Sequence, residues 1–388
     1  MSNLLSLDLI GCQHLEKLPG EMSNLINLRH LLLYGCDRLG QMPIGLGNLT
    51  NLQRLDYFVA KQSGPGDSGG ELAELKALNN LEGELRIVLG GRHCESSAAN
   101  LQMKDKLMAF ILDLTSSEEN HKDVLEGLQP HAHLRHLNIY GYNGESLPSW
   151  MMKNQLHCSL PNLVSIVITG GYNSKVTSLC SFGRLPHLQR LCLREFNSVE
   201  YIEEDEDNAP VNEDTVSRVA PLFPSLRELR LWKMPKLKGW QRDSRNNMGS
   251  ARPPSFSRLE HLTLHKVGFE VLPDELRGLS SLQSLDIQRC KRLKEIPEWI
   301  GNFTSFRTLY IYGCLNLMPL PMQIGNLPNL ELISIKRCRG AYAEWWADPT
   351  LPECPIKQLP TDKEWKWEYT SHDSFCCSKY RNAQNSCR

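Results

Sequence analysis

Five cysteines occupy the same place in a repeating phrase of apolar residues, and this repeat constrains the fold more than any other feature of the chain. The phrase reads L-x-x-L-x-L-x-x-C, with isoleucine or phenylalanine in place of some leucines. Its clear copies are Leu4/Leu7/Leu9/Cys12, Leu28/Leu31/Leu33/Cys36, Leu282/Leu285/Ile287/Cys290, Phe306/Leu309/Ile311/Cys314 and Leu330/Ile333/Ile335/Cys338. Neighbouring copies within each group are 24 residues apart. A constant period of this length indicates a stack of similar units, each in contact with its neighbours.

The spacing inside the phrase predicts a short strand followed by a turn. Apolar residues two positions apart point to one face of a strand. The cysteine lies just past that strand, where a small buried thiol can act as a weak hydrogen-bond donor. Less regular copies lie between the clear ones: Leu52/Leu55/Tyr57, Leu85/Ile87, Leu107 to Leu114, Leu134/Leu137/Ile139, Leu163/Ile166/Ile168, Leu188/Leu191/Leu193, Leu226/Leu229/Leu231 and Leu259/Leu262/Leu264. This is the leucine-rich-repeat signature in about 13 copies, and the two near residues 85 and 110 match it poorly.

The second half of each unit predicts an irregular outer arc. An apolar residue followed by proline recurs at Leu18-Pro19, Met42-Pro43, Leu147-Pro148, Leu272-Pro273, Ile296-Pro297 and Leu320-Pro321. Proline cannot continue a strand and suits an extended turn toward the outer face. The predicted fold class is therefore an α/β solenoid, a leucine-rich-repeat horseshoe with a parallel sheet on the concave face and mostly irregular or 3-10 arcs on the convex face.

We expect the solenoid to span residues 1–345, with two interruptions. A Gly/Ser-rich stretch covers residues 60–70 and is followed, from Glu71 to Leu81, by leucines at a helical spacing. An acidic insert at residues 203–214 is expected to be a solvated loop or, alternatively, an element that docks on a basic surface. Residues 346–388 are predicted to be an irregular tail that partly caps the last copy and has a disordered end.

Composition and charge exclude several functional classes. A net charge of −1 gives no overall attraction to nucleic acid or to an anionic membrane. No apolar run reaches the roughly 18 to 20 residues that span a bilayer. The chain enters a repeat directly at Leu4 without the basic and apolar regions of a secretory signal. We therefore expect a cytoplasmic protein, with the nucleus as an alternative, and reduced cysteines.

No motif predicts a catalytic residue, a cofactor or a metal. Gly66-Asp67-Ser68-Gly69-Gly70 spells the string around the nucleophile of chymotrypsin-like proteases, but a flexible Gly-rich loop has the same composition. The tail cysteines Cys376, Cys377 and Cys387 near His372 do not have the spacing of a zinc site. We expect no enzymatic activity, no cofactor and no small-molecule substrate.

The polar residues of the phrase predict a partner-binding surface. Residues between the leucines face the inner curve, and neighbouring copies align them about 4.8 Å apart. Arginine, lysine and aromatic residues dominate these positions: Arg29, His30, Tyr34, Arg135, His136, Tyr140, Arg190, Arg194, Arg227, Arg230, Trp232, Lys233, His265, Arg289, Arg307, Tyr310, Tyr312 and Lys336. Such residues are enriched at protein–protein hot spots. The predicted partner is an acidic protein surface, which includes the segment from Glu203 to Asp214 as a candidate; the alternative is an ordinary solvated face.

Strings between and within the repeats resemble a known family. They are Asn48 to Gly64 (NLTNLQRLDYFVAKQSG), Glu71 to Ile87 (ELAELKALNNLEGELRI), Val124 to Met151, Arg184 to Ile202 (RLPHLQRLCLREFNSVEYI) and Phe223 to Trp240 (FPSLRELRLWKMPKLKGW). In this order they are similar to the leucine-rich-repeat region of plant coiled-coil nucleotide-binding immune receptors, the disease-resistance proteins, over residues 1 to about 345. The resemblance implies a module that senses a pathogen effector or a modified host protein and restrains a nucleotide switch.

The chain departs from this family in lacking the switch itself. No G-x-x-x-x-G-K-[ST] phosphate-binding loop is present in these residues. The chain is thus expected to be a truncated gene product, a split partner or a fragment. Two other functions remain as alternatives. One is an intracellular scaffold similar to the Ras-associated leucine-rich repeats, whose uniform 23-residue step differs from the one here. The other is nucleic-acid binding, which the near-zero net charge disfavours.

Overall fold

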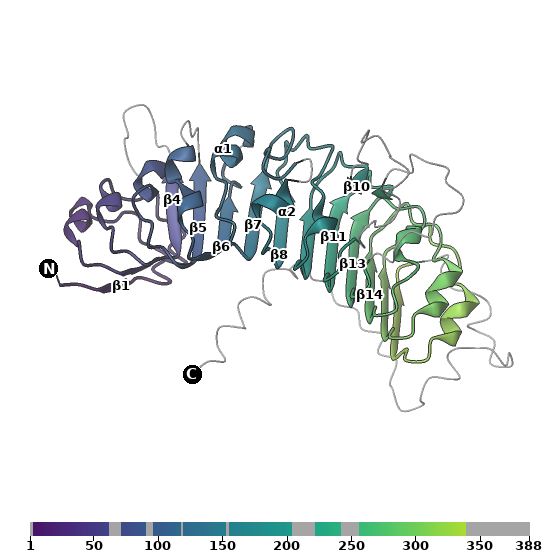
Figure 1. The fold of residues 1–388 in the computed structure, drawn as a ribbon. Coiled ribbons are helices and arrows are strands. Elements are labelled where there is room, and N and C mark those ends of the chain that lie inside the picture. The colour runs from purple at the N-terminus through teal and green to yellow at the C-terminus, as the bar shows by residue number, and fades with distance from the viewer. Residues whose placement is uncertain are drawn as a thin grey trace, which may run out of the picture.

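The computed structural model describes residues 3–61, 71–90, 96–117, 119–152, 155–203, 222–241 and 256–338 of the chain. These residues form a curved stack in which the strands line the inner side and short helical segments lie on the outer side (Figure 1). The predicted leucine-rich-repeat horseshoe is therefore confirmed, while the number of copies stays a prediction. The predicted Gly/Ser-rich interruption from residue 62, the acidic insert after Glu203 and the tail lie outside the described residues.

The inner strands run parallel and follow the order of the sequence almost without exception. Three strands form one sheet in the order β1-β2-β3, and eleven form a second in the order β4-β5-β6-β7-β8-β9-β11-β13-β14-β15-β16. Their bounds are β1 Ser6–Asp8, β2 His30–Leu32, β3 Arg54–Leu55, β4 Tyr57–Lys61, β5 Gly83–Gly90, β6 Leu107–Asp113, β7 His136–Tyr142, β8 Ser165–Gly170, β9 Arg190–Arg194, β11 Glu228–Met234, β13 His261–Val267, β14 Ser284–Gln288, β15 Thr308–Tyr312 and β16 Leu332–Lys336. The poorly matching copies near residues 85 and 110 thus supply strands β5 and β6.

The outer arcs are short, as the proline positions predict. The 3-10 segments are η1 Gly20–Asn24, η2 Leu46–Asn48, η3 Leu72–Leu75, η4 Ser96–Ala99, η5 Leu101–Met103, η6 Phe182–Arg184, η8 Asp274–Leu276, η9 Glu298–Asn302 and η10 Met322–Asn326, and the α-helices are α1 Lys122–Gly127 and α2 Leu156–Ser159. Pro19, Pro273, Pro297 and Pro321 each precede a 3-10 segment with φ between −60° and −67°. The helical leucine spacing after Glu71 yields only the four residues of η3, so it indicates an outer arc and not a helix.

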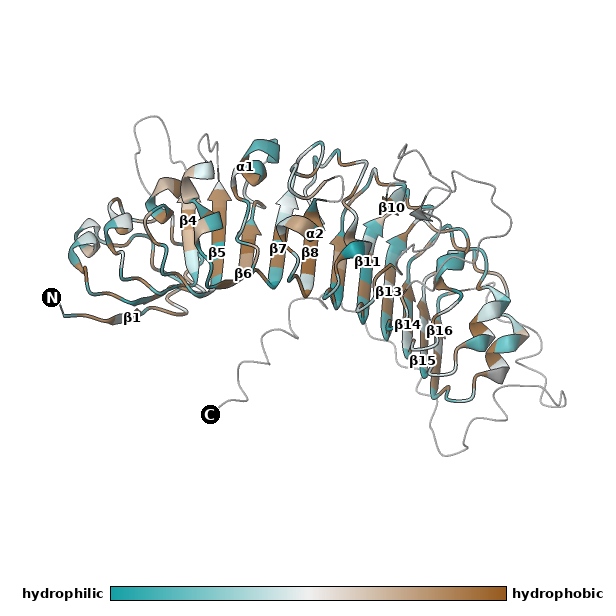
Figure 2. Ribbon diagram, in the orientation of Figure 1, coloured by the Kyte–Doolittle hydropathy of each residue, from teal (hydrophilic) through white to brown (hydrophobic). Residues whose placement is uncertain are grey.

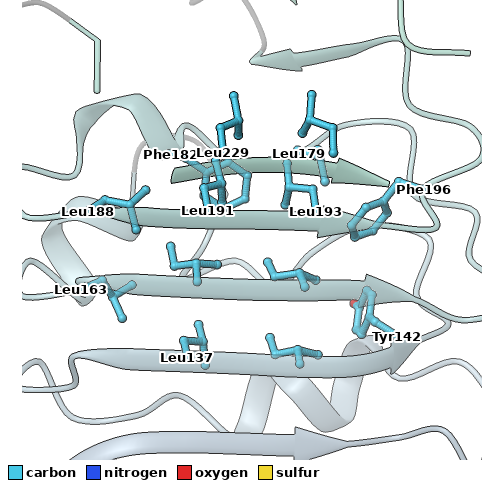
Figure 3. Packing of buried hydrophobic residues seen from close by; sticks show 14 of the residues in the cluster. Leu137, Tyr142, Leu163, Leu179, Phe182, Leu188, Leu191, Leu193, Phe196 and Leu229 are labelled. Atoms are coloured by element: carbon cyan, nitrogen blue, oxygen red, sulfur yellow. The ribbon is translucent and has the colours of Figure 1, made fainter. Parts of the chain in front are cut away.

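The leucines of the phrase stack in columns between the sheet and the outer arcs. Pairing places Leu137 beside Ile166, Ile166 beside Leu191 and Leu191 beside Leu229, and all four are at most 1% exposed. Figure 3 shows Leu137, Leu191 and Leu193 on parallel strands with their side chains on the same face of the sheet. Full burial of one leucine stabilises a fold by roughly 1.5–3 kcal/mol. Because each column crosses many repeats, the units stabilise one another cooperatively.

Cysteine fills the turn position after the strand by binding to the preceding repeat. The Cys36 Sγ donates to the Leu9 carbonyl at 3.2 Å, and the Cys290 Sγ donates to the Leu264 carbonyl at 3.7 Å. Cys36, Cys290, Cys314 and Cys338 are buried, whereas Cys12 in the first copy is exposed. In these two cases the thiol donates to a backbone carbonyl of the repeat before it. No described repeat precedes Cys12, and its side chain is exposed.

Side chains on the returning segments add hydrogen bonds between repeats. The Asn51 Nδ2 donates to the Ile26 carbonyl at 2.9 Å, the Asn80 Nδ2 to the Thr50 carbonyl at 2.9 Å, and the Asn329 Nδ2 to the Thr304 carbonyl at 2.7 Å. Each donor lies about one repeat beyond its acceptor. These asparagines explain why the returning segment so often spells Asn-Leu: the amide holds the arc in register while the leucine enters the core.

The two sheets meet in the segment that contains β3 and β4, because these two strands pair with strands of different sheets. Arg54 and Leu55 of β3 pair with His30 and Leu31 of β2, whereas β4 begins at Tyr57 and pairs with β5. Asp56 lies between the two strands and accepts a hydrogen bond from the Leu33 backbone N–H at 2.7 Å. None of the described helices is long and apolar enough to cross a bilayer.

A buried lysine lies beneath the outer arcs of the first half of the stack. Lys104 follows η5, is 0% exposed, and donates from Nζ to the Leu75 carbonyl at 2.7 Å. The Asn79 Oδ1 accepts more weakly, at 3.4 Å. Removal from water disfavours the ammonium form and lowers the pKa of Lys104 from 10.5 to about 8.

This pKa predicts a rise in stability at alkaline pH. Between about pH 8 and 10.5 the unfolded chain holds more protons at Lys104 than the folded chain, so stability increases with pH through that window. We expect the free energy of unfolding of wild type, relative to Lys104→Met, to rise by on the order of 2 kcal/mol between pH 7 and 10. Urea denaturation of both chains measures this difference. A difference that stays constant with pH contradicts the prediction.

Candidate protein-binding surface on the concave face

The predicted surface residues fall into three zones of the inner face. The residues immediately before a strand are Arg29, Arg135, Arg227 and Arg307, all exposed. The residues on the strand face, each next to a buried leucine or isoleucine, are His30, His136, Tyr140, Arg190, Arg194, Arg230, Trp232, His265, Tyr310, Tyr312 and Lys336. The residues at the turn after the second leucine are Tyr34, Lys233 and Arg289.

Strand pairing brings one set of these residues together in a continuous line. In the sheet, Arg194 is the partner of Trp232, and Trp232 is the partner of His265. The alignment continues through Gln288 of β14, Tyr312 of β15 and Lys336 of β16. We call the aligned residues Arg194, Trp232, His265, Gln288, Tyr312 and Lys336 the concave row. It extends over the second half of the molecule, where β11 and β13 carry more hydrophilic residues than β5, β6 and β8 (Figure 2).

Aromatic and cationic groups contact one another along the concave row. The Arg194 guanidinium carbon lies 4.7 Å from the centre of the Trp232 ring, a cation–π distance. The Trp232 and His265 rings are 4.5 Å apart. Near the other end, the guanidinium carbons of Arg289 and Arg337 lie 5.8 and 5.6 Å from the Tyr312 ring centre. These contacts hold large amphipathic side chains in defined positions, which lowers the conformational entropy lost when a partner binds.

Several of the predicted cations are paired with carboxylates of the same face. Arg227 pairs with Glu260 at 2.7 Å, and Lys233 pairs with Glu195 at 2.6 Å. Arg230 pairs with Glu228 on its own strand. At the far end Arg307 pairs with Glu331 at 3.4 Å. The positive charge of this face is therefore smaller than a count of its arginines and lysines indicates.

The remaining cations concentrate around His265. This side chain is 8% exposed, and burial lowers its pKa from 6.5 to about 4, with further lowering by the nearby charges of Lys266, Arg289, Lys233 and Arg194. The imidazole is thus neutral at pH 7. Four cations from neighbouring repeats thus act on one ring, and each of them disfavours its protonated form.

The first half of the inner face has a different character. On β6, β7 and β8 the positions level with Arg230 hold Ile111, Asn138 and Val167. Carboxylates gather further toward the N-terminus. Burial raises the pKa of Asp56, with a smaller contribution from Asp8, and burial likewise raises the pKa of Glu84, to which Asp56 adds. At the level of the concave row, Arg194 pairs with the neutral Thr169 of β8, and Tyr140 of β7 pairs with the acidic Asp113 of β6. His136 is level with Arg190 through Ser165, and His30 lies in the separate three-stranded sheet. The predicted basic and aromatic residues therefore do not form one line along the whole molecule.

The sequence pattern missed one part of this face. Arg86 and Asp113 form an ion pair at 2.5 Å in the poorly matching copies on β5 and β6. Burial opposes ionisation of Asp113, but hydrogen bonds from Thr115 and Arg86 outweigh it and lower the pKa. Lys266 and Arg337, which the spacing of the phrase also directs to the inner curve, lie beside the concave row at the same position after the apolar core as Arg289.

The arrangement is suited to binding. No described group of three or more histidine, cysteine or carboxylate side chains can hold a metal ion. The concave row offers guanidinium and ammonium groups, ring faces and ring N–H donors, which recognise carboxylates and backbone carbonyls. An extended surface of this kind recognises another macromolecule by many weak contacts.

Comparisons with known proteins agree with this architecture. A family model described as R13L1/DRL21 LRRs matches residues 72–196, and one described as Leucine Rich Repeat matches residues 281–303. Disease resistance protein RGA2 from Solanum bulbocastanum is 33% identical over 264 residues, which are 59% of this chain and 25% of that protein. The chain therefore spans about a quarter of the length of this relative.

Solved structures share the fold. A chain of the Drosophila Toll–Spatzle complex matches with a TM-score of 0.52 and 18% identity, covering 83% of this chain and 38% of that chain. At this identity the likeness concerns the fold alone.

The environment of His265 yields a direct test of the site's electrostatics. We expect its imidazole to titrate near pH 4 in the full chain. Replacement of two cations in Lys266→Gly/Arg289→Gly should raise this pKa without restoring the ordinary value, because burial remains its largest cause. NMR titration of the histidine ring carbons measures both chains. The described geometry is contradicted if His265 of the wild type titrates near pH 6.5. It is also contradicted if the pKa of His265 is the same in the variant and the wild type.

Proposed function

Because this chain carries leucine-rich repeats similar to those of plant disease-resistance proteins, we propose that it is the protein-recognition module of a plant intracellular immune receptor. It acts in defence against pathogens by sensing an effector or a host protein that an effector has altered. It also restrains a nucleotide switch, and no phosphate-binding loop of such a switch occurs in this sequence. The proposed compartment is the cytoplasm, with the nucleus as an alternative.

The concave row is the observation that carries this proposal. It combines Trp232, Tyr312 and arginine, the residue types that contribute most to protein–protein binding energy. The residues come from six strands that the core holds rigidly in register, so the surface is preorganised. Leucine-rich repeats of this kind are typically interaction modules, and we propose that this chain likewise binds proteins and catalyses no reaction.

The proposal predicts that the chain recognises the remainder of a related receptor. We expect the full chain, expressed in leaf cells with RGA2 from Solanum bulbocastanum lacking its own repeats, to co-precipitate with that protein and to reduce any cell death that its expression causes. The expected reason is that repeats 33% identical to those of RGA2 retain part of the surface that restrains the switch. Absence of association together with unchanged cell death contradicts the proposal.

The concave row predicts which substitutions weaken partner binding. Trp232→Ala should weaken a partner's dissociation constant by about thirtyfold, since a hot-spot aromatic residue contributes about 2 kcal/mol. Arg307→Ala should change it by less than about threefold, because this exposed arginine is paired with Glu331 and exposed ion pairs are worth about 0–1 kcal/mol. Biolayer interferometry with the effector or host protein identified by proximity labelling measures both. Equal effects of the two substitutions refute the row as the binding surface.

A further inference from the structure

We propose that the concave row binds an acidic segment of a partner protein in an extended conformation that crosses strands β9 to β16. This inference rests on the proposed function and adds the chemical class of the partner to it. Three independent features of the described residues support it: unfilled hydrogen-bonding groups, cations in an unfavourable backbone conformation, and the distribution of charge over the inner face.

Three neighbouring polar atoms of the row have unused hydrogen-bonding capacity. Arg194 Nε, Trp232 Nε1 and His265 Nδ1 are buried and have no hydrogen-bond partner among the described residues. Most buried polar groups in folded proteins are hydrogen-bonded, and an unfilled one destabilises its state. Two of these atoms carry hydrogen as donors, and His265 gains a second donor when it is protonated. Because these atoms are covered by neighbouring atoms, a carboxylate or carbonyl oxygen of a bound chain reaches them when the row side chains turn toward it.

The cations beside the row occupy a backbone position that favours glycine. The residue directly after each member of the row has a positive φ: Lys233, Lys266, Arg289 and Arg337 have φ between +52° and +56°, Glu195 has φ +64° and Gly313 has φ +67°. Four of these six positions thus carry a cation. In repeats outside the row the corresponding residues include Gly11, Gly35 and Gly141, with φ between +74° and +81°. Left-handed backbone is unfavourable for a residue with a side chain. Such strain clusters at functional sites, so long cations at these turns indicate that their charge is used.

The length of the concave row determines how long a bound segment can be. Six successive strands carry the row at a spacing of about 4.8 Å, so its length is about 24 Å, which an extended segment of about seven residues spans. Lys266 has no carboxylate partner among the described residues, and Arg194 faces the Trp232 ring. An acidic side chain can therefore approach this part of the row without first displacing an internal ion pair.

Charge on the rest of the inner face favours an acidic protein over a nucleic acid. Asp8, Asp56 and Glu84 lie on the same face toward the N-terminus, and the middle strands present neutral residues such as Val167. A nucleic-acid strand carries regularly spaced phosphates and needs a continuous positive track. A short acidic segment needs positive charge only along the concave row. The carboxylates at the N-terminal end of the inner face repel such a segment and so favour its position on the row.

The test uses the full chain and a fluorescein-labelled peptide of about ten residues that alternates glutamate and glycine. Fluorescence anisotropy should show saturable binding that weakens as the salt concentration rises. The matching glutamine–glycine peptide should bind at least about tenfold more weakly, and a labelled oligothymidylate should bind more weakly than the acidic peptide. Equal binding of the glutamine peptide, or stronger binding of oligothymidylate, overturns the proposal.

Two double variants separate binding from folding. Lys266→Gly/Arg289→Gly should weaken binding of the acidic peptide at least about tenfold while its denaturation midpoint stays equal or rises, because glycine relieves the positive φ. The control Arg258→Gly/Arg277→Gly removes the same charge outside the row; Arg277 has φ −60°, where glycine is unfavourable. It should keep the affinity and lose some stability. Equal loss of peptide binding in both variants overturns the proposal.

The outcome is independent of the receptor test. If the acidic peptide does not bind but the chain still associates with RGA2 lacking its repeats, the acidic partner is refuted and the proposed function stands. If the peptide binds at the row and the receptor remainder does not associate, the surface stands and the immune-receptor role is refuted.

Discussion

Stacking of the apolar side chains of one repeat on those of the next is the interaction on which the rest of this molecule depends. Leu28 and Leu31 of the second copy are 0% exposed, whereas the equivalent Leu4 and Leu7 of the first copy are only partly buried. The sequence phrase is the same, so the difference comes from the neighbour. Burial, strand register and the direction of every inner side chain are thus properties of adjacent repeats and not of a single unit.

Most of the fold and part of the binding surface follow from spacing alone. Apolar residues two apart determine which face of each strand is buried, and the structure places residues as different as His136 and Tyr312 on the strand face next to a buried leucine or isoleucine. The contact between Arg194 and Trp232 did not follow from spacing. Their copies are 38 residues apart, and the structure shows that β10 (Tyr201–Glu203) pairs with β12 (Gly239–Gln241) in a separate two-stranded sheet, leaving β9 and β11 adjacent.

The charged residues of the inner face could be counted from the sequence, but the ion pairs between them could not be predicted. Arg227 and Lys233 meet carboxylates that lie 33 and 38 residues away, because the repeat brings those positions side by side. The helical leucine spacing after Glu71 misled for a related reason: an outer arc also needs buried leucines, and tertiary packing selected a 3-10 turn. Local pattern therefore specifies burial well, while electrostatics depends on which repeats become neighbours.

The same stacking explains how the molecule tolerates strain at its surface. A left-handed lysine or arginine costs roughly 1–2 kcal/mol, comparable to the contribution of a single buried leucine. Each of these turns is flanked by buried residues of its own and adjacent repeats, such as Leu264 and Ile287, so the core holds the backbone in place. Exposed ion pairs contribute little, and a carboxylate from outside can compete for Lys233. The rigid core fixes the shape of the inner face. The weak ion pairs on its surface let the charged side chains exchange an internal carboxylate for an external one.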